Sequence, residues 1–559
     1  MERKKLDRRI TQNGDGEAAA GSCESSNGIG RRSFLSKLGG AAAATVATGL
    51  LASPPLAGAI EVGPQNPGQR RAQVFKKRLT ADINEKITPP RHATNGDEER
   101  YSNKIANFSK ALPHNSLGEV DTTSYAALIN ALTTGSSDDF EAITLGGVTK
   151  LSDPQACFAY AMEGADSQVE VTRIPPPYRG NEQGSEMAEN YWMALARDVA
   201  FADYDTDPTV AAAVADLGTF PAYTGPQPVS SENIFRGNTP GDLIGPYVSQ
   251  FFTVDVPYGS QVNKQQMNTT VAGDDHMFDY TEWLNIQNGA LATTSNVTDP
   301  QPRYIRNLRD LGQWVHVDWP YQAGLNSALI LNGMKATADP NSPYLTYTKQ
   351  ASLVTFGIVD VLDLVGRTSA AVLKAAWFQK WLVHRRVRPE EYAGNVHNQL
   401  IGAASYPLPA RLLSSPALTE VFAKFGTYLL PMAYAEGCPA HPSFPAGHPS
   451  LSGGAATVLK AFYDESFVIP SPMVASSDGL SLVPYTGATL TIGNELNKMA
   501  ANVGRGRDAA GVHWRSDGIS ALRLGEAIAI AVLTDLKANY WESFAGWNLT
   551  KFDGTSIVI

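Results

Sequence analysis

The spacing of apolar residues predicts helices along most of the chain. Apolar residues recur three or four positions apart, rather than alternating, over 187–202, 303–316, 350–387, 451–463, 490–503 and 517–538. Two intervening stretches rich in Gly, Pro, Ser or Asn, 219–242 and 465–486, are longer than ordinary connections, so we expect them to line a site. The pattern predicts a mainly α, large helical-bundle fold, with two four-helix-bundle-like units, long loops and little β structure.

The N-terminal hundred residues depart from this pattern. The run RRSFLSK (31–37), a Gly/Ala-rich apolar stretch and LAGA (56–59) are typical of a twin-arginine signal peptide, which we place at 1–59. The apolar run 38–51 is too short for a comfortable membrane span, so we expect no permanent anchor and an exported protein, periplasmic or extracellular. Residues 60–103 are polar and proline-punctuated, which predicts a flexible arm before a helical domain at 104–559.

Composition narrows the class of partner. The net charge of −10, with only 18% charged residues, argues against a nucleic-acid surface and favours a small-molecule partner. The cysteines Cys23, Cys157 and Cys438 form no Cys-x-x-Cys pair, so neither a disulfide scaffold nor a thiolate metal site is supported. A bridge between Cys157 and Cys438 and two separate buried thiols both remain open.

Three segments carry residue types that suit a tetrahedral oxyanion. The first is WFQKWLVHRRVRP (377–389), which we place at the end of a long helix that Pro389 terminates. Lys380 and Arg388 would then lie two helical turns apart, and an ammonium with a forked guanidinium suits phosphate-like oxygens. A solvated basic helix end is the alternative.

The second segment is HPSFPAGH (441–448), followed by small residues that predict a helix beginning at His448. Gly447 allows its backbone N–H to approach an anion at the helix N-terminus, and His448 is placed to move protons beside it. A plain structural turn is the alternative.

The third segment is GRGRDAAGVHWRSD (504–517), in which Arg507 precedes His513 by six residues and Asp517 follows it by four. If Asp517 starts the next helix, its carboxylate can accept from one ring nitrogen of His513 and leave the other free as a ligand. A hydrogen-bonded core histidine is the alternative.

In this order, the three segments resemble the signature of the superfamily that joins vanadium haloperoxidases to membrane-type and bacterial acid phosphatases. The spacing of eight between Lys380 and Arg388, and a histidine seven residues before His448, are more similar to algal-type bromoperoxidases than to phosphatases. Other stretches also resemble that family, so the similarity covers roughly 100–559; these stretches are 151–167, 190–204, 235–251, 283–289 and 549–555.

The resemblance implies an activity and its partners. The chain would bind vanadate and use hydrogen peroxide to oxidise bromide or iodide to hypohalous acid, which halogenates small organic acceptors. A homo-oligomer is also implied. Two other classes stay open: a phosphatase of the same superfamily, with His513 as nucleophile, and an exported binding protein that lacks activity.

The resemblance also implies roles for individual residues. His513 would be the axial ligand of vanadium, and the vanadate oxygens would be held by Lys380, Arg388, Arg507 and the Gly447 backbone N–H. His448 would be the acid–base group, while Lys380 would also stabilise charge on the departing oxygen. His441 favours bromide or iodide over chloride, Trp377 would shape the halide site, and Asp517 would orient His513.

The sequence departs from the family pattern at two positions. Ala446 stands where the family usually has serine, and the loss of one neutral hydrogen bond, about 0.5–1.5 kcal/mol, predicts weakened rather than abolished vanadate binding. Gly506 replaces a more usual polar residue, for which the sequence offers no reason. His316 and Asp318, in WVHVDW (314–319), could lie near the site as supporting groups, although we expect structural roles for them.

Overall fold

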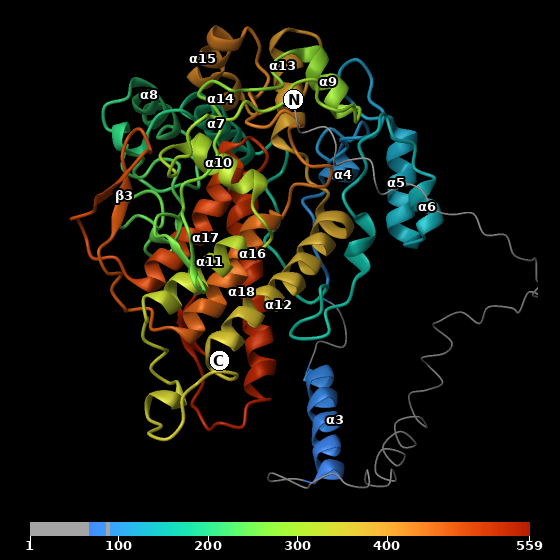
Figure 1. Cartoon of the computed structure of the whole chain (residues 1–559). Helices are drawn as coiled ribbons and strands as arrows, with labels where there is room; N and C mark the ends of the chain where they lie inside the picture. Colours follow the sequence, from blue (N-terminus) through green and yellow to red (C-terminus); the bar gives the residue numbers. More distant parts are fainter. Residues whose placement is uncertain (1–65, 85–89) are drawn as a thin grey trace, which may run out of the picture. The chain divides into compact units, whose positions relative to one another are not determined.

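The computed structural model describes residues 66–84 and 90–559, and this part of the chain is mainly helical (Figure 1). The α-helices are α3 (Pro67–Asn84), α4 (Asp97–Arg100), α5 (Thr122–Thr134), α6 (Ser137–Glu141), α7 (Asn181–Leu195), α8 (Pro208–Leu217), α9 (Tyr280–Gln287), α10 (Leu308–Val317), α11 (Gln322–Gly333), α12 (Ile358–Phe378), α13 (Pro389–Leu400), α14 (Ala410–Leu413), α15 (Pro416–Phe425), α16 (Gly447–Phe462), α17 (Ile492–Ala509) and α18 (Arg515–Lys537).

Shorter elements complete the described chain. The 3-10 turns are η1 (Pro154–Phe158), η2 (Phe201–Asp203), η3 (Gln250–Phe252) and η4 (Pro343–Leu345), and η5 (Gln379–His384) is a π-helical turn. The strands form small antiparallel pairs: β1 (Val256–Tyr258) with β2 (Gln261–Asn263), β3 (Met473–Ala475) with β4 (Leu482–Pro484), and β5 (Asn548–Thr550) with β6 (Ser556–Val558). The prediction of a mainly helical fold with little β structure is confirmed.

The chain divides into two units, Met1–Thr80 and Ala81–Ile559. Of the first unit, the described residues are 66–80, most of helix α3. The predicted signal peptide, 1–59, and its apolar run lie outside the described residues. None of the helices that the structure describes is long and apolar enough to span a membrane.

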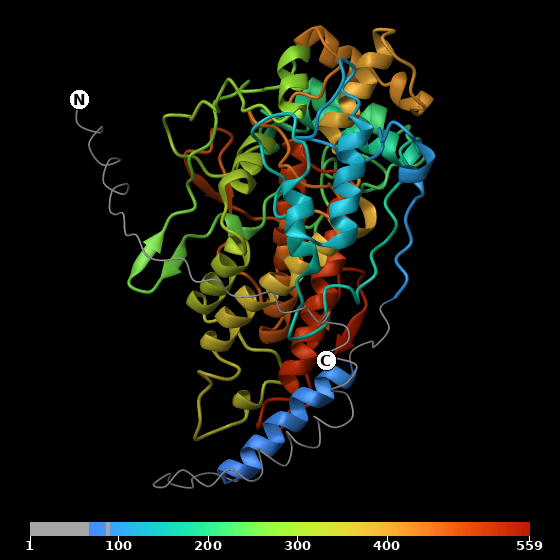
Figure 2. The same cartoon turned by 90° about the vertical axis from the view of Figure 1, so that its right-hand side faces the viewer.

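In the second unit, α12, α16, α17 and α18 pack against one another, and α10 and α11 pack beside them (Figures 1 and 2). Small residues let α16 and α18 approach closely. A Cβ atom added to Gly525 would lie 2.1 Å from the carbonyl oxygen of Ser450, and one added to Gly453 would lie 2.6 Å from that of Leu522. These glycines therefore set the spacing of the two helices that position the predicted oxyanion segments.

The predicted segment at 377–389 has a different conformation from the one expected. Helix α12 ends at Phe378, the chain makes the π-helical turn η5, and Arg385 adopts a left-handed conformation with φ 41°. Pro389 does not terminate a helix but occupies the first turn of α13, where its missing N–H costs nothing. Lys380 and Arg388 therefore lie on different elements, and the expectation of two turns of one helix is wrong.

Part of the predicted flexible arm is held by polar contacts. Asp97 is buried and accepts a hydrogen bond from the backbone N–H of Tyr178 at 2.7 Å. Glu98 accepts from Nε of Arg385 at 3.0 Å and from the Tyr125 hydroxyl at 2.7 Å. Earlier in the same stretch, Pro67–Asn84 forms helix α3. Residues 97–98 are held by polar side-chain contacts, so the pattern of apolar residues could not predict their fixed position.

Glu391, in the first turn of α13, is a buried carboxyl with incomplete hydrogen bonding. Its Oε1 accepts from the backbone N–H groups of Ser109 at 3.2 Å and Lys110 at 2.9 Å. Oε2 is buried and has no hydrogen-bond partner within 66–84 and 90–559. Burial, with the neighbouring Glu390 carboxylate, raises the pKa of Glu391 to about 7.

We expect Glu391→Gln to stabilise the protein at alkaline pH. The folded-state pKa of Glu391 lies above its usual value of 4.5, so its stabilising contribution is full below pH 4.5 and is lost as the pH rises to about 7. The variant escapes this loss, so its melting temperature relative to the wild type should be higher at pH 8 than at pH 5. The same change at the exposed Glu141 is the control. An equal difference at both pH values would contradict the prediction.

Candidate active site

A cavity of about 450 Å³ in the second unit brings the three predicted segments together. Its lining includes residues from all three: Trp377 from the first, His441, Gly447 and His448 from the second, and Arg507 and His513 from the third. Lys380 and Arg388 are fully buried and contact the second and third segments by hydrogen bonds. Tertiary packing of α12, α16, α17 and α18 thus assembles residues that lie more than a hundred positions apart.

His513 follows the end of α17, and the next helix, α18, fixes its orientation. Asp517, in the first turn of α18, accepts a hydrogen bond from Nδ1 of His513 at 2.9 Å, as the sequence predicts. Nε2 of His513 lies 3.0 Å from Nη1 of Arg388, which donates to it. Burial, together with the cations Arg388 and Lys380, holds the pKa of His513 well below its usual range. The imidazole is therefore neutral and keeps a lone pair on Nε2.

Three buried cations surround this imidazole, and backbone carbonyls are their main neutral partners. Nζ of Lys380 donates to the carbonyl oxygens of Pro442 and Ser443, each at 2.8 Å. Nη1 of Arg388 donates to the Val512 carbonyl at 2.7 Å, and Nη1 of Arg507 donates to a carbonyl of α10 at 2.7 Å. Burial, with Arg388 and Arg507 nearby, holds the pKa of Lys380 well below its usual range. An anion bound in this cavity would offset the energetic cost of burying these three cations and would reduce the repulsion between them.

Two observations show that the residues present fit an oxyanion such as vanadate. Nε of Arg507 is buried and has no hydrogen-bond partner among the residues that the structure describes, so a donor of this cation is available. Gly447 is the first residue of α16, and a Cβ atom added there would lie 3.5 Å from the Trp377 ring and so occupy space beside the cavity. Three cations, a helix N-terminus and a neutral imidazole nitrogen together suit a tetrahedral oxyanion that also takes a nitrogen ligand.

His448, the second residue of α16, is paired with a carboxylate. Its Nε2 lies 3.1 Å from Oδ1 of Asp318, and its side chain is one-third exposed. Burial and Arg507 lower the pKa of His448, and the Asp318 carboxylate opposes that shift. A partly exposed imidazole oriented by a carboxylate is suited to proton transfer.

His316 and Asp318 both line the cavity, so the structure places them near the site, the less expected of the two possibilities that the sequence left open. Nε2 of His316 lies 2.6 Å from Oε1 of Glu436, and the His316 ring stacks on Tyr434 with centroids 3.7 Å apart. His316 and Asp318 both lie at the C-terminal end of α10, and this end of the helix reaches the cavity. Glu436 and Tyr434 gave no signal in the sequence.

His441 and Trp377 form an aromatic wall of the cavity. Their ring centroids lie 4.9 Å apart, and Nη2 of Arg388 donates to Nδ1 of His441 at 3.0 Å. Burial, followed by the nearby cations Lys380 and Arg388, holds the pKa of His441 well below its usual range. A neutral imidazole and an indole thus lie beside the cationic groups.

The structure explains one departure from the family pattern and locates the other. A Cβ atom added to Gly506 would lie 2.9 Å from the carbonyl oxygen of Leu311 and 2.9 Å from the Val315 side chain, so close packing of α10 on α17 requires glycine there. Ala446 is buried at the N-cap of α16, where its side chain forms no capping hydrogen bond.

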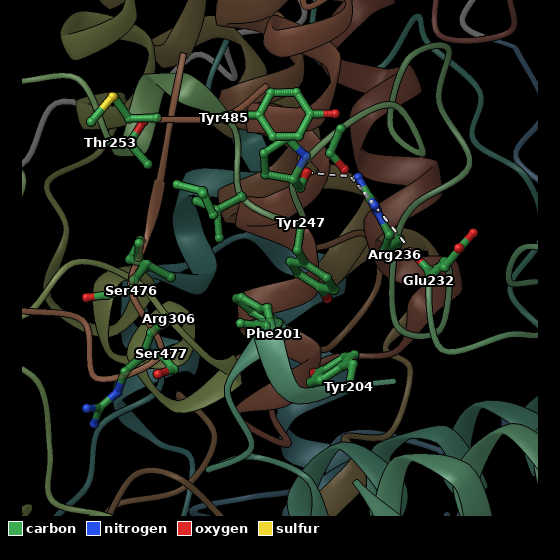
Figure 3. Close-up of a pocket in the computed structure, with 18 of the residues that line it drawn as sticks. Phe201, Tyr204, Glu232, Arg236, Tyr247, Thr253, Arg306, Ser476, Ser477 and Tyr485 are labelled. Carbon is green, nitrogen blue, oxygen red and sulfur yellow. Dashed lines mark hydrogen bonds between the residues drawn. The ribbon is translucent and has the colours of Figure 1, made fainter. Parts of the chain in front are cut away.

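Both long loops line a second cavity, of about 440 Å³, whose lining residues differ from those of the first (Figure 3). Figure 3 shows the rings of Phe201, Tyr204, Tyr247 and Tyr485 around this cavity. Arg236, in the first loop, donates to the carbonyls of Gly245 at 3.1 Å and Pro246 at 2.9 Å, which closes its own loop.

Among the cysteines that the structure describes, Cys157 and Cys438, both are buried and neither forms a disulfide. Sγ of Cys438 lies 3.6 Å from the carbonyl oxygen of Val512, the residue that precedes His513. Of the two alternatives that the sequence leaves open, separate buried thiols match the structure.

Comparison with known proteins identifies the family. The family model for the VCPO second helical-bundle domain matches residues 368–542, which contain all three oxyanion segments. A vanadium-dependent bromoperoxidase from Ascophyllum nodosum is 34% identical over 501 residues, covering 84% of this chain and 89% of that protein. This chain belongs to the vanadium-dependent bromoperoxidase family.

Other vanadium-dependent bromoperoxidases extend the match over most of the fold. The protein from Corallina officinalis is 31% identical over 563 residues, covering 83% of this chain and 94% of the relative. The homohexameric structure of the second vanadate-dependent bromoperoxidase from Ascophyllum nodosum superposes with a TM-score of 0.84 at 30% identity. That match covers 90% of this chain and 93% of the bromoperoxidase chain.

Proposed function

We propose that this chain is a vanadate-dependent haloperoxidase that uses hydrogen peroxide to oxidise bromide or iodide. The observation that carries the proposal is a neutral imidazole, His513, whose Nε2 faces the buried cations of the cavity. In the overall reaction, the peroxide O–O bond breaks, one oxygen is transferred to bromide to give hypobromous acid, and the other leaves as water after taking up a proton. Bromide is oxidised and peroxide is reduced. The hypohalous acid then halogenates small organic acceptors.

Each role predicted from the sequence is compatible with the position of its residue. Nε2 of His513 would be the vanadium ligand, and Lys380, Arg388, Arg507 and the Gly447 N–H would hold the vanadate oxygens. Bound vanadate would supply a Lewis-acidic centre that polarises the peroxide oxygen–oxygen bond. Lys380 would stabilise charge on the departing oxygen.

His448 would move the protons of the reaction. Because Nε2 of His448 is occupied by Asp318, a proton exchanged with peroxide or with the departing oxygen would pass through the other ring nitrogen, Nδ1. The Asp318 carboxylate stabilises the imidazolium that forms when His448 takes up a proton.

The proposal also covers the halide, the oligomeric state and the export of the protein. The resemblance of His441 to the histidine of bromoperoxidases supports bromide or iodide as the halide, rather than chloride. The homohexameric relative supports assembly into a homo-oligomer. Export by the twin-arginine pathway, to the periplasm or the exterior, rests on the sequence at 31–59.

Halogenation of a phenolic reporter by the purified protein tests the proposal. The assay would contain hydrogen peroxide and bromide, before and after addition of orthovanadate, with iodide and chloride in parallel. We expect activity that depends on vanadate and is higher with bromide or iodide than with chloride. Hydrolysis of a phosphate ester without halogenation would contradict the proposal and favour a phosphatase. Stoichiometric vanadate binding without turnover would favour a binding protein.

We expect Ala446→Ser to strengthen vanadate binding. A serine at this position can donate one hydrogen bond to an oxyanion oxygen, worth about 0.5–1.5 kcal/mol, which corresponds to about two- to tenfold in the dissociation constant. Titration of both proteins with orthovanadate measures the difference. The hydroxyl could instead cap α16, which would raise the melting temperature and leave the vanadate dissociation constant unchanged, and that pattern would contradict the prediction.

A further inference from the structure

Ser443 contacts both Lys380 and Asp517, the carboxylate that orients His513. It is fully buried, and each of its polar groups contacts a different residue. Its backbone N–H donates to the Arg386 carbonyl at 3.1 Å, its carbonyl accepts from Nζ of Lys380 at 2.8 Å, and its hydroxyl donates to Oδ2 of Asp517. One small residue therefore connects a cation of the cavity with the carboxylate that orients His513.

The carboxylate of Asp517 is held on both oxygens. Oδ1 accepts from Nη1 of Arg386 at 2.6 Å, and Arg386 is in turn paired with Glu186 at 2.9 Å. Oδ2, which faces the imidazole of His513, accepts from the Ser443 hydroxyl and, at 3.2 Å, from the Trp514 backbone N–H. The Ser443 hydroxyl is thus a side-chain donor to the oxygen that binds His513.

The hydroxyl acts on the imidazole through this shared oxygen. A carboxylate can rotate about its bond to Cβ, and Arg386 fixes only Oδ1 directly. Donors on Oδ2 fix the direction in which that oxygen meets Nδ1 of His513, and so they fix the plane of the ring and the direction of the Nε2 lone pair. A ligand nitrogen binds most strongly when its lone pair points at the bound group.

We propose that Ser443 is a positioning residue, whose hydroxyl fixes Asp517 and thereby holds Nε2 of His513 in the direction that binds vanadate. The inference rests on the proposed function of the same site. Its side chain can be tested separately from its backbone, because the Ser443 carbonyl, and not its hydroxyl, binds Lys380. Removal of the hydroxyl leaves the Lys380 and Arg386 contacts in place.

Titration of the vanadate-free full-length protein with orthovanadate tests this role without relying on turnover. We expect Ser443→Ala to raise the vanadate dissociation constant at least about tenfold, since loss of a group that supports a metal ligand costs about 10–100-fold in affinity. The loss in kcat for bromide oxidation at saturating vanadate should be smaller than the loss in affinity. Ser443→Thr, which keeps the hydroxyl, should restore most of the affinity.

Ser327→Ala is the matched control. Ser327 is also fully buried, and its hydroxyl donates to the Ala323 carbonyl of α11 at 2.8 Å, so the same atom is lost without contact with Asp517. The control should keep the wild-type dissociation constant. If Ser443→Ala does not fold, Ser443→Cys provides a side chain of similar size with a weak donor and should also bind vanadate less tightly than the wild type.

Two outcomes would overturn the proposal, and they differ from each other. A wild-type protein that binds vanadate, together with folded Ser443→Ala or Ser443→Cys of equal affinity, would remove the positioning role and leave the proposed function intact. A wild-type protein that neither binds vanadate nor oxidises bromide would overturn the proposed function and, with it, the role of Ser443.

Discussion

Replacing His513 by alanine is expected to abolish both vanadate binding and bromide oxidation. His513 provides a neutral ligand nitrogen, Nε2, that faces the cations of the cavity, and Asp517 holds it in place. Loss of a group that supports a metal ligand lowers the affinity by about 10–100-fold. Loss of the ligand itself should have a larger effect, so the vanadate dissociation constant should rise by more than about 100-fold. Titration with orthovanadate, followed by the halogenation assay, measures both effects.

The His513→Ala variant should nevertheless fold. Asp517 keeps its contacts with Arg386, Ser443 and the Trp514 N–H, so no buried charge loses all of its partners. His114→Ala is a matched control, since His114 is an imidazole that hydrogen-bonds to Ser109 at 2.9 Å and lies outside the set of residues that line the cavity. Folded His513→Ala with wild-type activity would refute the assignment of the ligand.

Replacing His448 by alanine should separate proton transfer from vanadate binding. A positioned acid–base group typically contributes about 10²–10⁴-fold to the rate, so kcat should fall by about that factor. The vanadate dissociation constant should change far less, because His513, Lys380 and the arginines are unaltered. Steady-state kinetics at saturating vanadate, with a parallel binding titration, measures the split.

Addition of free imidazole provides the control for His448→Ala. If the lost function is proton transfer, imidazole in solution should enter the partly exposed site and restore part of the rate. A variant with unchanged kcat, or with vanadate affinity lost in proportion to kcat, would show that His448 does not act as the acid–base group.

The sequence predicted most long helices because their apolar residues face a common core. The expected helices at 451–463, 490–503 and 517–538 correspond to α16, α17 and α18, although α17 continues to Ala509. The prediction was wrong at 377–389, where the helical spacing of apolar residues continues although the α-helix itself ends at Phe378. The π-helical turn and the left-handed Arg385 are set by contacts with distant residues, such as the Glu98 carboxylate, and local spacing carries no record of them.

The same contrast applies to the site. The sequence by itself determined the residue types of the three segments, and their order resembles the signature of vanadium haloperoxidases, which implies an oxyanion site before any contact is known. Only the tertiary structure decided that Asp318 pairs with His448, that Ser443 donates to Asp517, and that the long loops line another cavity. A sequence pattern records the chemistry and the local conformation of each segment, whereas the partner of a buried polar group depends on which distant segment packs against it.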